Sequence, residues 1–193
     1  MVASKINVEV AGVSSSVGAG SDSNQPSTET FGLDVCDIPI PVTDSESIVR
    51  AIKRPSHTTT KKGKEVLKSA AFKAAPERDD VSVMRHTYMG TQACREKAAS
   101  LVEGNDRVKY VGLAVLSASQ IRQLASDVID SREEFCGHAH ISHGVVLTRD
   151  EPPDSVLTMA LNERLREMIA AATFYPDPSI EMDKWAEETV AAQ

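Results

Sequence analysis

The sequence predicts an α+β domain in which a small mixed or antiparallel sheet packs with about four helices, behind a disordered N-terminal tail. Short β-rich stretches alternate irregularly with helical patterns, which disfavours a regular βαβ array. Residues 14–30 are rich in Ser, Gly, Asn and Thr and show no hydrophobic period. Such a segment buries too little apolar surface to offset the entropy of ordering, so we expect it to be disordered.

The tail is expected to cover residues 1–46, ahead of a single globular domain at 47–193. Within the tail, residues 31–42 (FGLDVCDIPIPV) are apolar and contain two prolines. This segment is either an arm that lies on the domain or a docking motif for a protein partner. The chain has no apolar run of roughly 18 residues, and polar residues interrupt the N-terminal stretch, so we expect neither a membrane span nor a signal peptide.

The first elements of the domain carry weak signals. Residues 47–54 precede Pro55 and are expected to form a helical turn, because helices tend to end before a proline. Residues 57–64 (HTTTKKGK) predict a polar loop. Two short apolar stretches follow at 66–72 and 81–84.

Clearer patterns occupy the middle of the chain. Residues 91–102 predict a helix that begins at a capping threonine and ends before a glycine. Residues 108–116 (VKYVGLAVL) are apolar and β-rich, which predicts a buried strand. Ser117 is expected to cap the next helix, in which apolar residues recur at i, i+3, i+4 and i+7 as far as Val128.

The C-terminal third predicts one strand and two helices. Residues 138–147 form the strand candidate. Asp154 follows two prolines and is expected to cap a long helix over 154–172 with a broad apolar face. Asp177, followed by proline, is expected to open a last helix.

The charge of the chain is unevenly distributed. The net charge is −7, which argues against bulk affinity for nucleic acid. However, residues 50–73 hold eight Lys or Arg against one acid. This basic segment is either a solvated face or a contact for nucleic acid or an acidic partner. The residues expected to contact a partner or a phosphate are Lys53, Arg54, Lys61, Lys62 and Lys64.

The three cysteines are too few and too irregularly spaced for a disulfide framework. A reducing cytoplasm is therefore the expected compartment.

The stretch CGHAHISHG at 136–144 contains three of the five histidines. On a strand, residues two apart share a face, so two imidazoles there can bind one zinc ion. The candidate metal ligands are Cys136, His138, His140 and His143, and the candidate catalytic residues are His138, His140, His143 and Glu134. The alternative is an amphipathic strand with Ala139 and Ile141 inward, His138 paired with the backbone or with a nearby polar side chain, and the other two histidines facing solvent. This structural hypothesis is favoured, so no cofactor is expected.

Several short words, among them KSAAF, VSVMR, VGLAVLSASQIR and GHAHI, occur in order over about 95 residues from Arg50 to Gly144. This order resembles small uncharacterised bacterial proteins, which look like accessory genes of mobile or defence loci. The resemblance implies no reaction and no catalytic residues. It implies that His138 belongs to a recurring structural landmark, of which His140 and His143 are not part.

Three functions follow as hypotheses. The first is a non-enzymatic accessory or adaptor protein of a bacterial multiprotein system, such as one of genome or antiviral defence, with protein contacts through residues 31–42 or the helix at 154–172. The second is a small metal-dependent hydrolase or nuclease that uses CGHAHISHG. The third is a nucleic-acid-binding module that uses residues 50–73. No membrane partner is expected.

Overall fold

The computed structural model describes residues 36–177. The elements, in chain order, are β1 (Ser47–Arg54), β2 (Thr58–Lys61), β3 (Lys64–Leu67), the 3-10 helix η1 (Ser69–Ala71), β4 (Asp80–Arg85), α1 (His86–Ser100), β5 (Lys109–Ser117), α2 (Ala118–Gln123), β6 (Asp127–Asp130), β7 (His138–Ser142), α3 (Val156–Ala171) and β8 (Thr173–Pro176).

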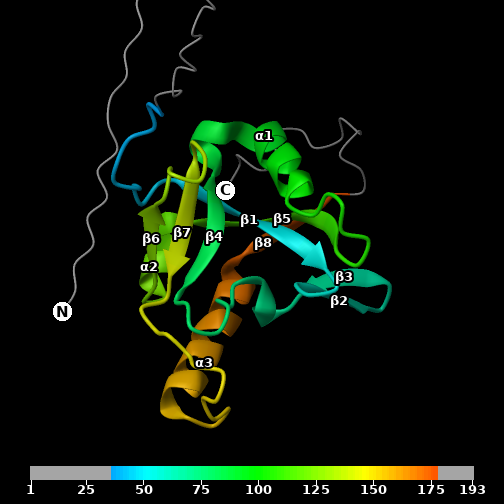
Figure 1. Ribbon diagram of the computed structural model, residues 1–193, viewed down its shortest axis with the longest axis vertical. Helices are drawn as coiled ribbons and strands as arrows, with labels where there is room; N and C mark the ends of the chain where they lie inside the picture. The colour runs from blue at the N-terminus through cyan, green and yellow to red at the C-terminus, as the bar shows by residue number, and fades with distance from the viewer. Residues whose placement is uncertain (1–35, 178–193) are drawn as a thin grey trace, which may run out of the picture. The chain divides into compact units, whose positions relative to one another are not determined.

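Six strands form one antiparallel sheet in the order β6-β7-β4-β1-β5-β8, and β2 and β3 form a separate hairpin (Figure 1). The predicted α+β class is confirmed. The described residues contain three α-helices, whereas about four were expected. The fourth expected helix lies beyond Asp177, outside the described residues. No helix among residues 36–177 is both long and apolar enough to cross a membrane.

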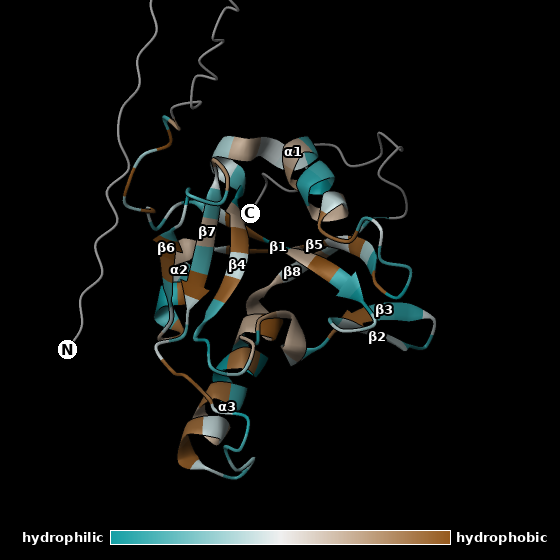
Figure 2. Ribbon diagram, in the orientation of Figure 1, coloured by the Kyte–Doolittle hydropathy of each residue, from teal (hydrophilic) through white to brown (hydrophobic). Residues whose placement is uncertain are grey.

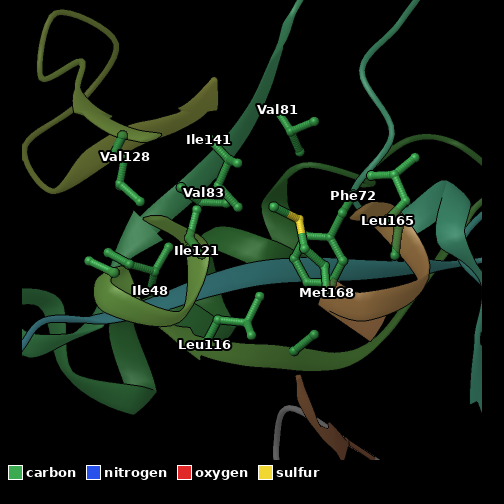
Figure 3. Close-up of a cluster of buried hydrophobic side chains, with 14 of the residues drawn as sticks. Ile48, Phe72, Val81, Val83, Leu116, Ile121, Val128, Ile141, Leu165 and Met168 are labelled. Atoms are coloured by element: carbon green, nitrogen blue, oxygen red, sulfur yellow. The ribbon is translucent and has the colours of Figure 1, made fainter. Parts of the chain in front are cut away.

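The sheet is covered on both faces. On one face the helices α2 and α3 and the segment around Phe72 enclose the larger core, whose side chains converge in Figure 3. On the other face α1 contributes Cys94 and Ala98 to a smaller core. Strand β1 serves both, because Ile48 points into the larger core and Val49 into the smaller one.

Residues 47–54 form strand β1, so the expected helical turn is wrong. Ile48, Val49, Ala51 and Ile52 are at most 4% exposed. A strand buried on both faces requires a nearly continuous apolar run, and at this length periodicity cannot distinguish it from a helix. The expected polar loop at 57–64 is likewise the start of the β2–β3 hairpin.

The predicted cap at Ser117 is confirmed, but the helix it begins is short. Ser117 and Gln120 form a reciprocal capping box. Helix α2 ends at Gln123, and Ala125 has a left-handed φ of 53°. Val128, expected in the helix, lies in β6 and pairs with Ile141 of β7. Pairing with β7 therefore overrides the helical period.

The C-terminal elements also differ from those expected from the sequence. Strand β7 ends at Ser142, five residues earlier than expected. Ser155, not Asp154, caps α3 through its hydroxyl. Strand β8 was not predicted, and it closes the sheet by pairing with β5.

Residues 36–46 belong to the domain, so the expected tail boundary at residue 46 is too late. Val42 is 3% exposed and lies in the larger core. Arg132 donates hydrogen bonds to the carbonyl oxygens of Cys36 and Ile38, at 2.9 and 2.8 Å. For its described part, residues 36–42, the candidate docking segment is thus an arm that lies on the domain.

Cys36 and Cys136 form a disulfide across 100 residues of sequence. The cysteine spacing predicts no disulfide framework, yet two of the three cysteines are paired. Two cysteines suffice here because the arm brings Cys36 to the turn before β7. The pairing removes the argument from cysteine content for a reducing compartment, because disulfides persist in oxidising ones.

A buried ion-pair network ties the arm to the sheet. The Arg85 side chain is 0% exposed, and its guanidinium donates to both Glu46 oxygens at 2.7 and 2.8 Å. It also donates to Asp130 at 2.6 Å, and Asp130 accepts further bonds from Arg132. Burial raises the pKa of Glu46 and of Asp130. The hydrogen bonds and charges of their arginine partners, together with hydrogen bonds from Thr43 to Glu46, outweigh burial, so each pKa lies below its ordinary value.

We predict that acid weakens the fold through these carboxylates. Because their folded-state pKa values are depressed, their contribution is complete above the ordinary carboxyl range of about 4 and is lost as the pH falls through the folded values. Glu46→Gln should lower the free energy of unfolding at pH 7 by about 3–5 kcal/mol, because it leaves Arg85 partly unpaired. It should also flatten the acid dependence, measured by urea unfolding between pH 7 and 3. Glu133→Gln, an exposed control, should reproduce the wild-type curve, and an unchanged acid slope in Glu46→Gln would contradict this account.

We also predict that the disulfide carries a large share of the stability. Opening it with dithiothreitol should lower the free energy of unfolding by about 2–5 kcal/mol, since the bond closes a long loop of the unfolded chain. The double variant Cys36→Ser/Cys136→Ser should show that loss without reductant and should not respond to it. A wild-type protein whose urea midpoint ignores reductant would refute the prediction.

Candidate functional site

Strand β7 places two histidines on one face of the sheet. Ala139 and Ile141 point into the larger core, as the alternation predicts. His138 and His140 therefore point to the opposite face, where their rings meet edge to face with centroids 4.7 Å apart.

His143 does not join this pair. It is 2% exposed and lies past the end of β7, so the expectation that it faces solvent is wrong. Its Nε2 donates to the carbonyl oxygen of Phe72 at 2.7 Å, and its Nδ1 accepts from the Ser126 hydroxyl at 3.1 Å. Burial lowers its pKa, which keeps the ring neutral. His143 therefore links η1, β6 and β7 and is not a candidate ligand.

Cys136 is not a candidate ligand in the disulfide state, since its sulfur is bonded to Cys36. The next residue, Gly137, turns the chain into β7 with a φ of +89°. A Cβ there would lie 2.6 Å from the side chain of Met89. The tight turn delivers His138 to its position directly after the disulfide.

With Cys136 and His143 excluded, Glu134 is the third candidate ligand beside His138 and His140. One potential ligand atom each from Glu134, His138 and His140 lie within 4.8 Å of one another. Glu134 lies in the loop between β6 and β7 and is exposed, His138 is buried, and His140 is partly buried. We call these three residues the His–Glu cluster.

The orientation of His138 is fixed by the backbone. Its Nδ1 lies 3.0 Å from the carbonyl oxygen of Ser131, which can only accept, so Nδ1 carries the hydrogen. Its Nε2 then holds a lone pair. This buried nitrogen has no hydrogen-bond partner and lies 3.4 Å from the Glu134 carboxylate, another acceptor. Burial lowers the pKa of His138, which opposes a proton between the two groups.

His140 is oriented in a similar way. Its Nδ1 lies 3.1 Å from Asp80 Oδ2, within ion-pair distance although not aligned for a hydrogen bond. Its Nε2 lies 4.0 Å from Glu134 Oε1. Each imidazole thus presents Nδ1 to an oxygen acceptor and Nε2 to the same carboxylate. A carbonyl or carboxylate behind each histidine is the usual arrangement around metal-ligating histidines.

The spacing suits a metal ion. Ligand atoms about 2.0–2.1 Å from a tetrahedral zinc lie roughly 3.3–3.5 Å apart. The separation of His138 Nε2 and Glu134 Oε2, at 3.4 Å, matches this value. His140 Nε2 lies 4.0 Å from the other oxygen, Oε1, and the three ligand atoms lie within 4.8 Å of one another, so His140 must move inward for all three to bind one ion. A small cavity of about 50 Å³ adjoins Glu134 and His138, enough space for one or two water molecules.

The basic segment is divided between two places. The exposed lysines 61, 62 and 64 lie at the β2–β3 turn, on the hairpin at the edge of the domain (Figure 1). Arg54 is paired with Glu65 at 2.6 Å, so its charge is largely offset. Lys53 instead lines a groove of about 550 Å³ beside β4. Of the five candidate contact residues, Lys53 alone lines this groove, whereas Arg54 contacts the hairpin that carries the three exposed lysines.

Sequence reasoning missed the groove residues Arg50, Arg78 and Asp80. Asp80 and Ser82 alternate with Val81 and Val83 along β4, and this signal could have placed them on the histidine face. Arg50 interrupts an apolar run, which could have marked it as a partly buried functional charge.

Comparison with models of protein families, with curated protein sequences and with solved structures gives no match for this chain.

We predict that His143 is a stability residue. His143→Ala should lower the free energy of unfolding by about 1–3 kcal/mol, because the Phe72 carbonyl and the Ser126 hydroxyl lose their buried partner. His140→Ala should cost less than about 1 kcal/mol in metal-free protein, because Asp80 keeps its bonds from Arg78. Urea unfolding in the presence of a chelator measures both. A His143→Ala variant as stable as the wild type would contradict its structural role.

Proposed function

We propose that the protein is a small divalent-metal-dependent hydrolase, with zinc as the first candidate metal, held by Glu134, His138 and His140. The observation that carries the proposal is the buried, unpartnered Nε2 of His138, which faces the Glu134 carboxylate. Two acceptors at this distance repel each other unless a cation lies between them. A metal ion with the carboxylate and both imidazoles as ligands removes that repulsion.

The donor set favours hydrolysis over a purely structural role. Two histidines and one carboxylate occupy three of four tetrahedral positions, which is the pattern of catalytic rather than structural zinc sites. The bound metal would lower the pKa of a coordinated water and so supply a nucleophile near neutral pH. Glu134 is more than half exposed at its side chain, so water and substrate can reach this position.

The other residues of the site have positioning roles. The Ser131 carbonyl fixes the His138 ring by a hydrogen bond, and the Asp80 carboxylate lies beside Nδ1 of His140, so both rings have Nε2 toward Glu134. Arg78 donates two hydrogen bonds of 2.7 Å to Asp80 and so fixes the carboxylate behind His140. Hydrogen bonds from arginine hold the pKa of Asp80 below its ordinary value, which keeps it charged.

A second candidate function is the adaptor, favoured by one feature of α3. Val156, Leu157 and Met159 are 78, 52 and 54% exposed in the first turns of this helix. These turns, at the end of α3 away from the sheet, show apolar residues in Figure 2. Clustered exposed apolar side chains are typical of protein contacts. The helix predicted as a docking surface at 154–172 therefore stays a candidate for one.

We predict that the purified protein binds one divalent metal ion per chain through the His–Glu cluster. Elemental analysis should find zinc, manganese or iron near one equivalent, and Glu134→Gln and His140→Ala should each weaken the affinity at least about tenfold. Glu133→Gln, the same change one residue earlier, is the matched control and should bind as the wild type does. Hydrolysis of chromogenic phosphate and carboxylate esters should disappear with a chelator and return with the metal.

Two results would overturn the hydrolase. One is the absence of tight metal binding in metal-saturated buffer, which would leave the adaptor as the better candidate. The other is equal affinity of the wild type and Glu134→Gln, which would place any bound metal elsewhere.

A further inference from the structure

The groove beside β4 exists because two neighbouring strands diverge. Strands β1 and β4 pair at only two positions, Ile48 with Arg85 and Val49 with Met84. Beyond them Arg50 occupies the opening, where it donates to the Ser82 carbonyl at 2.5 Å and to the Ala71 carbonyl at 3.0 Å. A partly buried arginine thus replaces the ladder hydrogen bonds that β1 would otherwise give to β4.

The groove is strongly positive. Arg50, Lys53, Lys73 and Arg78 line it, and Asp80 is the one acid among its described lining residues. Within residues 36–177, the ammonium groups of Lys53 and Lys73 make no ion pair and no hydrogen bond. Lys53 bonds His57 through backbone atoms alone. Arg50 uses two of its five N–H groups on the carbonyls, so three remain.

The pKa of a nearby histidine, His57, also reflects the positive charge of the groove. His57 is buried, and its pKa is lowered to about 4, with burial as the first cause and the nearby positive charges included in that value. These charges are those of Arg50, Lys53 and Lys68. Burial and the charge of Arg50 likewise lower the pKa of Lys53. Cations held this close repel one another, and a bound anion relieves that repulsion.

We propose that this groove binds the phosphate group of an organic phosphate ester and presents it to the His–Glu cluster. The catalytic part of this statement rests on the proposed function, whereas phosphate binding does not. The volume of about 550 Å³ suits a ligand of nucleotide size. No aromatic side chain is among the described lining residues, so the groove recognises the phosphate and offers a base no stacking surface.

The groove and the cluster are continuous. Arg50, Ser82 and Leu101 line both the groove and the small cavity beside Glu134 and His138. Arg78 lies in the groove and bonds Asp80, whose carboxylate lies behind His140. A phosphate held by Lys53 and Lys73 can therefore extend toward the metal position past Arg50.

The test compares two pairs of lysines with the same charge change. Lys53→Gln/Lys73→Gln removes two groove charges, and Lys61→Gln/Lys62→Gln removes two charges at the hairpin turn. Calorimetry with pyrophosphate at low salt should show at least about tenfold weaker binding for the groove pair. The hairpin pair should stay within about twofold of the wild type. Equal losses in both pairs, or no pyrophosphate binding by the wild type, would overturn the proposal.

Two further arms identify the source of the phosphate and isolate the metal. Anisotropy with an oligothymidylate of about 12 nucleotides tests a nucleic-acid backbone. If the oligothymidylate binds more tightly than pyrophosphate and Lys53→Gln/Lys73→Gln abolishes its binding, the phosphate belongs to a nucleic acid. If pyrophosphate binds more tightly than the oligothymidylate, the ligand is a small phosphate compound. Repeating the pyrophosphate titration on chelator-treated protein and on Glu134→Gln should leave the groove effect intact. Groove binding without metal would thus support this inference even where the hydrolase fails, and a groove effect that vanishes without metal would refute it.

Discussion

The fold depends on the need to pair one buried charge. The Arg85 guanidinium has no access to solvent, and an unpaired charge in that position would cost several kcal/mol. Glu46 and Asp130 neutralise it from positions before β1 and at the end of β6, so three distant segments must meet at the end of β4. Asp130 then holds Arg132, whose other bonds fasten the arm at Cys36 and Ile38. The loop that carries Glu134 begins at this network. The Arg85 charge that orders the arm therefore also helps to position Glu134, the candidate metal ligand.

The site lies where the two faces of the sheet are covered differently. On the face of the larger core, β4 and β7 bury Val81, Val83, Ala139 and Ile141 under α2 and α3. On the other face, the smaller core under α1 ends at Met84 and Phe135. The polar side chains of Asp80, Ser82, His138 and His140 are next to this margin, because Ser82 pairs with His140 and Met84 with His138. The alternation along β4 and β7 therefore places apolar side chains in the larger core and the polar side chains of the candidate site on the opposite face.

Part of this arrangement could be predicted from the sequence. The alternation of β7 predicts that Ala139 and Ile141 face the core and that His138 and His140 share the other face. The class of fold and the cap at Ser117 follow from local patterns as well. The partnership of Glu134 with the histidines requires the loop before β7 to fold back over its face, and no periodicity encodes that. His143 was misassigned because the strand ends one residue before it, after which alternation no longer describes the chain. The disulfide could not be predicted because it depends on where the arm lies, 100 residues away in sequence.

The Cys36–Cys136 bond makes the chain between its ends a covalent ring, which contains β1 to β6 and excludes β7, α3 and β8. A single cut of the backbone inside the ring, for example at the exposed β2–β3 turn, leaves the protein one covalent molecule. The bond also gives a direct covalent path for force between the arm and the turn before β7. A load applied at Cys36 reaches Cys136, two residues before His138, through one S–S linkage. Tension on the arm is therefore transmitted to the segment that leads into the strand with the histidines.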